Sequence, residues 1–220
     1  MSAVMIRIIA SAFFCAAGLL GLASSALAHP HVFADARLEV AVAPDGTVEI
    51  MRHVWRFDDV FSSTVMLEFD ADTDNRLEDP ELEEVASVVT ESLAEFNYFQ
   101  TILVGDESVE VKPVTDMKAL FEDGQLIIFF TTQPAEPVNI KSSPSFGVYD
   151  PTFYTAIDFV DESEMVLEGA PANCGRKMVV PDPDEALAQN QATLTDAFFN
   201  DPQGTNWSKL LATRMEVTCK

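Results

Sequence analysis

Basic residues are scarce in this sequence, and their scarcity excludes several kinds of partner. The 220 residues contain 13 Lys and Arg against 36 Asp and Glu, which gives a formal net charge of −23. Binding to a nucleic-acid backbone needs a basic surface, and electrostatic docking on anionic lipid needs a polybasic patch. We therefore expect neither nucleic acid nor an anionic membrane surface as a partner. Clustered carboxylates instead suit hard cations.

The signatures of common enzymes are missing as well. The sequence has no Gly-rich phosphate loop, no G-x-S-x-G and no H-E-x-x-H. Its only histidines are His29, His31 and His53, and none lies in the context of a hydrolase triad. We therefore do not expect an enzyme.

Long apolar runs are confined to the N-terminus. The apolar segment 8–23 is followed by the small-residue sequence ALA at 26–28. This pattern is typical of a secretory signal peptide cleaved after Ala28, and the run is short for a membrane span of about 20 residues. An uncleaved anchor is the alternative. We predict a signal peptide over 1–28 and a periplasmic mature protein that begins at His29.

Cysteine is nearly absent from the expected mature chain. Cys15 lies in the signal segment, which leaves Cys174 and Cys219. An even pair in an exported protein favours a disulfide, which would add roughly 4 kcal/mol of stability on the chain-entropy model. The alternative is a pair of thiolate metal ligands, which an oxidising compartment disfavours.

Hydrophobic periodicity indicates an α+β fold. Apolar and polar residues alternate over 32–42, a turn follows at 44–46, and a second strand is expected over 47–57. Helical spacing predicts helices at 59–69, 80–95 and 182–200. Further strands are expected at 101–111, 125–132, 146–148, 155–160, 164–167 and 215–219.

We predict one domain over 29–220. It is mainly antiparallel β and sandwich-like, with an inserted EF-hand-like helix-loop-helix at 59–95 and a C-terminal helix.

The acidic segment between the first two expected helices fits the calcium-loop pattern. On a twelve-residue loop over 70–81, oxygen ligands fall at positions 1, 3, 5, 7, 9 and 12, and Leu77 is the inward apolar residue. Pro80 is expected to begin the exit helix, with Asp79 as its cap. The predicted Ca²⁺ ligands are Asp70, Asp72, Asp74, the carbonyl of Arg76, Glu78 and Glu81.

One position of this loop departs from the pattern. Position 6 usually carries Gly, and here it is Asn75. Asn tolerates the left-handed conformation better than other non-glycine residues, so the loop remains compatible with Ca²⁺. The alternative is an acidic connector that only caps a helix.

The three histidines cluster near the mature N-terminus and suggest a transition-metal site. If cleavage occurs before His29, this residue offers an α-amine and an imidazole, and His31 adds a second imidazole. Pro30 has no N–H, so a chelate through successive backbone amides is blocked. Nitrogen ligands of this kind suit Zn²⁺, Ni²⁺, Co²⁺ or Cu²⁺.

A hairpin centred near residues 45–46 places His53 opposite Arg37 or Leu38, about 20 Å from His31 along the sheet. The same register brings His31 nearer Asp58 and Asp59. We therefore rank His29 and His31 as the first ligands, Asp58 or Asp59 as a further carboxylate ligand, and His53 third. A surface or core-edge position is the alternative for His53.

Several motifs occur in an order that resembles the DUF1007 family of bacterial periplasmic proteins. The motifs are HPHVFADAR at 29–37, HVWRFD at 53–58, the acidic loop at 70–81, EFNYF at 95–99, YDPTFY at 149–154 and GAPANC at 169–174. The resemblance implies a periplasmic component associated with inner-membrane transporters of the nickel/cobalt or zinc type.

The leading hypothesis is a periplasmic accessory protein that captures Zn²⁺, Ni²⁺ or Co²⁺ and serves an inner-membrane divalent-metal transporter. A copper carrier or copper redox protein that uses the N-terminal histidine is one alternative. A calcium-braced interaction module without a transition metal is the other.

Overall fold

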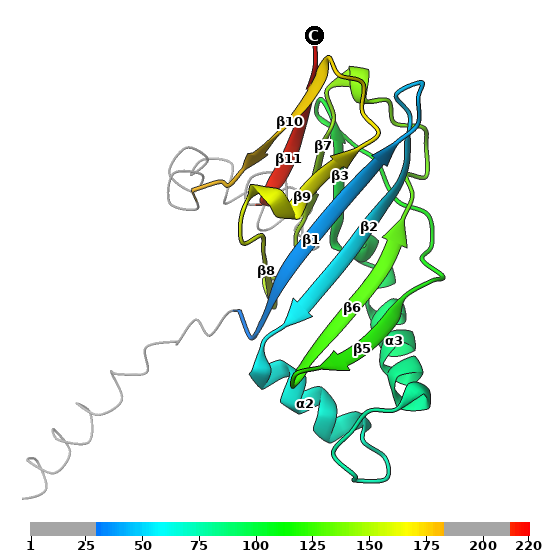
Figure 1. The fold of residues 1–220 in the computed structure, drawn as a ribbon, viewed down its shortest axis with the longest axis vertical. Helices are drawn as coiled ribbons and strands as arrows, with labels where there is room; N and C mark the ends of the chain where they lie inside the picture. Colours follow the sequence, from blue (N-terminus) through cyan, green and yellow to red (C-terminus); the bar gives the residue numbers. More distant parts are fainter. Residues whose placement is uncertain (1–29, 183–211) are drawn as a thin grey trace, which may run out of the picture.

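The computed structural model describes residues 30–182 and 212–220 (Figure 1). Mostly antiparallel strands form two sheets, accompanied in the described ranges by two α-helices, so the predicted α+β, sandwich-like class is confirmed. The predicted signal peptide, His29 and the 183–200 part of the expected C-terminal helix lie outside the described residues. Within the described ranges, no helix has the length and apolar character needed to cross a bilayer.

The first sheet is built on a long hairpin. Alternate residues of the first strand, starting at Val32, are buried, which confirms the predicted alternation. Strand order is β5–β6–β2–β1–β8, and β9 also pairs with β1. The strands are β1 (Val32–Val42), β2 (Val48–Phe57), β5 (Lys118–Glu122), β6 (Gln125–Thr132), β8 (Thr155–Asp158) and β9 (Met165–Glu168).

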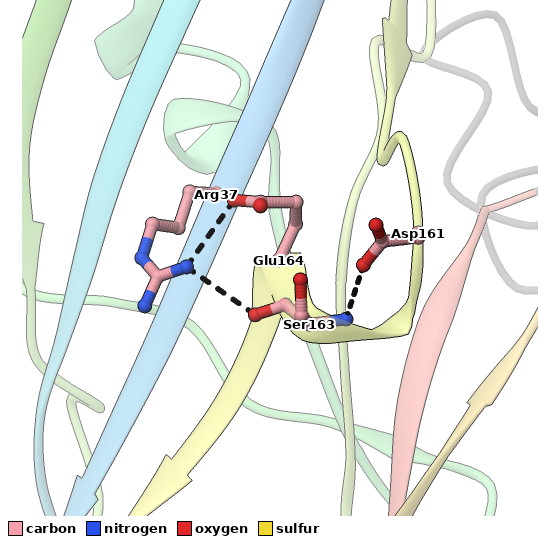
Figure 2. Close-up of polar contacts among 4 residues, drawn as sticks. All are labelled: Arg37, Asp161, Ser163 and Glu164. Carbon is pink, nitrogen blue, oxygen red and sulfur yellow. Dashed lines mark hydrogen bonds and ion pairs between the residues drawn. The ribbon is translucent and has the colours of Figure 1, made fainter.

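The edge of β1 that faces away from β2 pairs with two short parallel strands. β8 pairs with the start of β1, and β9 pairs with its later half. The connecting turn contains the short helix η3 (Glu162–Glu164) and lies against Arg37 of β1 (Figure 2). The Arg37 guanidinium donates to the Ser163 carbonyl and to the Glu164 carboxylate, both at 3.3 Å. The turn is thereby fixed at the middle of β1.

The second sheet has the order β10–β11–β7–β3–β4. Its strands are β3 (Gln100–Val104), β4 (Glu107–Ser108), β7 (Ser145–Val148), β10 (Cys174–Val179) and β11 (Arg214–Cys219). Cys174 and Cys219 lie opposite each other on β10 and β11 and form the expected disulfide, with an S–S distance of 2.07 Å. The strand predicted over 101–111 is instead two strands, because the chain turns at Gly105, where φ is +63°.

The two α-helices follow the hairpin directly. α2 (Asp59–Phe69) begins after β2, and α3 (Asp79–Ala94) packs beside β5 (Figure 1). The buried Ser62 hydroxyl of α2 accepts a hydrogen bond from the Leu126 amide of β6 at 2.9 Å, which joins the helix to the sheet. η1 (Asn97–Phe99) leads from α3 into β3, and η2 (Ile140–Ser142) precedes β7.

Candidate metal sites

The carboxylates of the acidic loop converge between α2 and α3. One oxygen each from Asp70, Asp72 and Asp74 lie within 4.8 Å of one another, and the same holds for Asp72, Glu78 and Glu81. Ca²⁺ holds oxygen ligands at about 2.3–2.6 Å, so ligands on opposite sides of the ion lie about 5 Å apart. Each group of three therefore has a spacing compatible with Ca²⁺, and Asp72 belongs to both groups.

The loop backbone is organised by its first residue. The Asp70 carboxylate accepts hydrogen bonds from the Asp74 amide at 3.1 Å and from the Asn75 amide at 2.8 Å. Asn75 has a φ of +65°, so it takes the left-handed conformation expected at position 6. Thr73 also has a positive φ, of +62°, which the sequence pattern did not predict. Arg76, whose carbonyl falls at position 7, lies exposed in the same loop.

Glu81 closes the loop from its far end. Its two oxygens accept hydrogen bonds from the Ala71 amide at 2.8 Å and the Glu78 amide at 3.0 Å. These backbone hydrogen bonds hold the pKa of Glu81 below its usual value. An ionised carboxylate offers about four lone-pair sites, so each oxygen can still bind a cation.

The pKa of Glu78 is shifted in the opposite direction to that of Glu81. Loss of hydration, followed by the negative charges of the neighbouring carboxylates, raises the pKa of Glu78 above its usual value. A divalent cation among these groups would remove the repulsion.

The exit helix starts one residue earlier than predicted. α3 begins at Asp79 with Glu78 as its cap, whereas the sequence favoured Asp79 as the cap and Pro80 as the first residue. The reason is the hydrogen bond from the Glu78 amide to the Glu81 carboxylate, three residues ahead, which selects Glu78 as the capping position. Leu77 is 8% exposed and is packed inward, as the loop pattern predicts.

His31 lies at the entry to β1 with an exposed side chain. Its amide donates to the Tyr154 carbonyl at 2.9 Å, and the two ring centroids are 5.0 Å apart. The turn before β8 therefore fixes the backbone of His31 while its imidazole stays at the surface. Among the described residues, the groups of three or more acidic, His or Cys side chains within metal-binding distance are those of the acidic loop.

Asp58 serves as the N-cap of α2. One carboxylate oxygen accepts from the amides of Val60 and Phe61, and the other accepts from the Phe33 amide at 2.9 Å. Burial raises the pKa of this carboxyl, but the amides of Phe61, Phe33 and Val60 lower it further, so it ends below its usual value. The predicted register is confirmed, because Asp58 lies beside the start of β1. Its three hydrogen bonds join β1 to α2 and leave about one further lone-pair site on the carboxylate.

His53 lies in the core, apart from His31. It pairs with Leu38 in the hairpin, is 1% exposed, and stacks on Phe130 of β6 with centroids 4.4 Å apart. Its Nε2 is 3.0 Å from the Thr132 hydroxyl, whereas its Nδ1 is buried with no hydrogen-bond partner. Burial lowers the pKa of His53 to about 3, so the ring is neutral.

The structure therefore does not place His53 beside His31, and the core-edge alternative describes His53 better. Its partners Phe130 and Thr132 come from β6, and no local sequence pattern links β6 to His53.

Comparison with known proteins gives the chain a family. A family model described as "Protein of unknown function (DUF1007)" matches residues 14–219. The chain belongs to this family. The DUF1007 protein is also 24% identical over 188 residues to an uncharacterized protein of Haemophilus influenzae (strain ATCC 51907 / DSM 11121 / KW20 / Rd), an alignment that covers 83% of this chain and 89% of the relative. The resemblance inferred from the collinear motifs is thus confirmed, and the DUF1007 chain is matched over nearly its whole length.

Proposed function

We propose that this DUF1007 protein is a periplasmic metal-binding accessory protein. It captures a divalent transition ion, Zn²⁺ first and Ni²⁺ or Co²⁺ next, through His29 and His31 at the mature N-terminus. It then delivers the ion to an inner-membrane divalent-metal transporter. Imidazole and amine nitrogens are suitable ligands for these ions.

The observation that supports this proposal is the contrast between the two described histidines. His31 is exposed where the chain enters β1, whereas His53 is sealed in the core. A cargo site must be accessible to load and unload, and within the described residues His31 is the histidine that meets this need. The strongly acidic surface also raises the local concentration of cations.

We further propose that the acidic loop binds Ca²⁺ as a structural brace. The five carboxylates join the end of α2 to the start of α3, so an ion among them fixes the angle between the helices. A single loop in an extracellular module binds weakly, with a Kd on the order of 10⁻⁴ to 10⁻³ M. Calcium at this site then serves structural bracing rather than signalling.

Native mass spectrometry and calorimetry of the mature protein test the cargo site. The chain beginning at His29 is titrated with Zn²⁺, Ni²⁺, Cu²⁺ and Ca²⁺, next to a variant that lacks residues 29–31. His31→Ala and His53→Phe form a matched pair, because each removes one imidazole. We expect the truncated chain to lose binding of the transition ion. His31→Ala should lower the affinity for this ion at least tenfold, and His53→Phe should leave the affinity unchanged.

Three results would count against this assignment. Unchanged affinity in the truncated chain would remove the N-terminal site. Tight Cu²⁺ binding with nitrogen ligation, without binding of Zn²⁺ or Ni²⁺, would favour a copper carrier. Binding of Ca²⁺ alone would leave a calcium-braced interaction module.

A further inference from the structure

β5 lies at the edge of the first sheet and borders a groove. Among the described strands β5 pairs with β6 alone, and α3 lies along its other side (Figure 1). The groove between β5 and α3 has a volume of about 610 Å³. Leu82 and Ala86 line it from α3, and Met117 and Ala119 line it from the strand side. The edge of β5 is therefore reached through this groove.

The turn between β5 and β6 fixes the hydrogen-bonding pattern of the hairpin. Its two residues, Asp123 and Gly124, have φ angles of +53° and +82°, as in a type I′ turn. In a hairpin with a two-residue turn, the flanking pair is hydrogen-bonded, and here that pair is Glu122 and Gln125. Bonded and non-bonded pairs then alternate along the two strands.

This alternation makes Ala119 and Phe121 direct their backbone N–H and C=O groups away from β6. The Leu126 amide, which lies opposite Phe121, donates to the Ser62 hydroxyl of α2 at 2.9 Å, as expected for a residue of a non-bonded pair. Within the described ranges, no hydrogen bond satisfies the outward backbone groups of Ala119 and Phe121. Unpaired groups of this kind are a template for a further strand.

The groove has the length of a short extended segment. Its α3 wall runs from Asp79 to Glu91, a distance of about 18 Å at the helical rise of about 1.5 Å per residue. An extended chain rises about 3.3 Å per residue, so the groove holds about five residues. β5 itself has five residues, so a segment of this length can pair along the whole edge.

The charges along the groove favour a basic segment. Asp79, Glu83 and Glu91 line it with exposed side chains, and Lys118 is the one basic residue of the lining. A second copy of this acidic protein would bring like charges together at the groove, which disfavours pairing between two β5 edges. A partner segment that carries Lys or Arg has the complementary charge.

We propose that the groove between α3 and β5 binds an extended basic segment of a partner protein by strand addition. Its backbone pairs with the outward N–H and C=O groups of Ala119 and Phe121. Its Lys or Arg side chains lie against Glu83 and Glu91. Since successive side chains of an extended chain point to opposite sides, the residues between the basic ones are apolar and face Leu82.

Binding of synthetic hexapeptides to the mature protein tests this groove. The probe alternates Lys and Val and is blocked at both ends, and its control has Glu in place of Lys. Two further peptides carry N-methyl groups, one on all Lys residues and the other on all Val residues. We expect the Lys–Val peptide to bind at least tenfold more tightly than the Glu–Val peptide. One of the two N-methylated peptides should lose at least tenfold in affinity, because alternate residues direct their N–H groups to β5.

Hydrogen exchange measured by NMR locates the contact. The amide hydrogens of Ala119 and Phe121 should exchange at least tenfold more slowly when the Lys–Val peptide is bound.

Charge variants of α3 give a matched comparison. Glu83→Gln should lower the affinity for the Lys–Val peptide about threefold, the effect of one exposed ion pair. Glu84→Gln makes the same charge change at the neighbouring residue, which is exposed but does not line the groove, and should leave the affinity unchanged. Zn²⁺ binding at the N-terminus should be the same in both variants, so this proposal and the proposed cargo site can fail separately.

Three outcomes would overturn the proposal. If both N-methylated peptides bind as tightly as the Lys–Val peptide, the attraction is only electrostatic and no strand is added. If the Ala119 and Phe121 amides are already protected in the protein alone, a second copy occupies the edge of a dimer, or another part of the chain occupies it in a monomer. If no peptide binds, the edge of β5 is closed to partners.

Discussion

The acidic loop and the surroundings of His53 place titratable side chains in opposite electrostatic environments. The loop gathers five carboxylates at the surface, where backbone amides donate to Asp70 and Glu81. His53 is a titratable ring placed among aromatic side chains, where burial keeps it neutral. We therefore propose that a cation stabilises the first region, and we expect a proton to destabilise the second.

The largest expected effect concerns the pH dependence that His53 imposes on folding. Its pKa is about 3 in the folded state and about 6.5 when unfolded, so the unfolded chain takes up the proton first as the pH falls. The stability that depends on neutral His53 is complete above pH 6.5 and decreases between pH 6.5 and 3. This loss amounts to about 2 kcal/mol by pH 5.

His53→Phe removes this dependence, because phenylalanine can stack on Phe130 but cannot be protonated. Urea unfolding at pH 7 and pH 5 compares the variant with the wild type. We expect the wild type to lose about 2 kcal/mol more than the variant over this range. Parallel pH profiles would show that His53 titrates equally in the folded and unfolded states, and the contrast with the loop would fail.

The next effect is calcium stabilisation at the loop. At a Ca²⁺ concentration of about 10 times the Kd, the folded state should gain about 1.4 kcal/mol, which appears as a higher Tm. Glu81→Gln should lose most of this gain, because it removes the charge of the ligand that closes the loop. Glu84→Gln, one turn along α3, has the same charge change and should keep the gain. If Ca²⁺ does not change the Tm of the wild type, the loop is only an acidic connector.

The smallest effect is expected at Asn75. The left-handed conformation at position 75 costs a non-glycine residue roughly 1–2 kcal/mol, and this cost is lower for Asn than for most residues. Asn75→Gly should therefore strengthen Ca²⁺ binding by up to about fivefold, measured by calorimetry. Asn75→Ala should weaken binding by a similar factor. Equal affinity in all three proteins would show that position 6 does not limit the loop.

Local patterns predicted the elements whose periodicity is strong. The bounds of β1, α2 and β6 agree with the sequence prediction, and β2 differs by one residue at its start. β5 and β10 were not predicted, because their residues are exposed or half-buried and carry little alternation of apolar and polar character. Such strands are held by their neighbours β6 and β11 more than by their own pattern.

The acidic loop and the N-terminal region around Asp58 also differ in how well the sequence predicted them. The loop ligands lie within twelve consecutive residues, so spacing alone predicted their convergence and the left-handed Asn75. The cap role of Asp58 depends on Phe33, which is distant in sequence, and its carboxylate was expected to be a free ligand. Long-range contacts of this kind leave no periodic signal.

The sequence by itself determined the acidic character, the cysteine pair, the hairpin and the calcium-type loop, because each depends on composition or on short spacing. Only the tertiary structure decided that β6 encloses His53 and that Asp58 joins β1 to α2. The physical reason is that burial and hydrogen-bond satisfaction depend on which strands become neighbours, and strand order is a property of the whole chain.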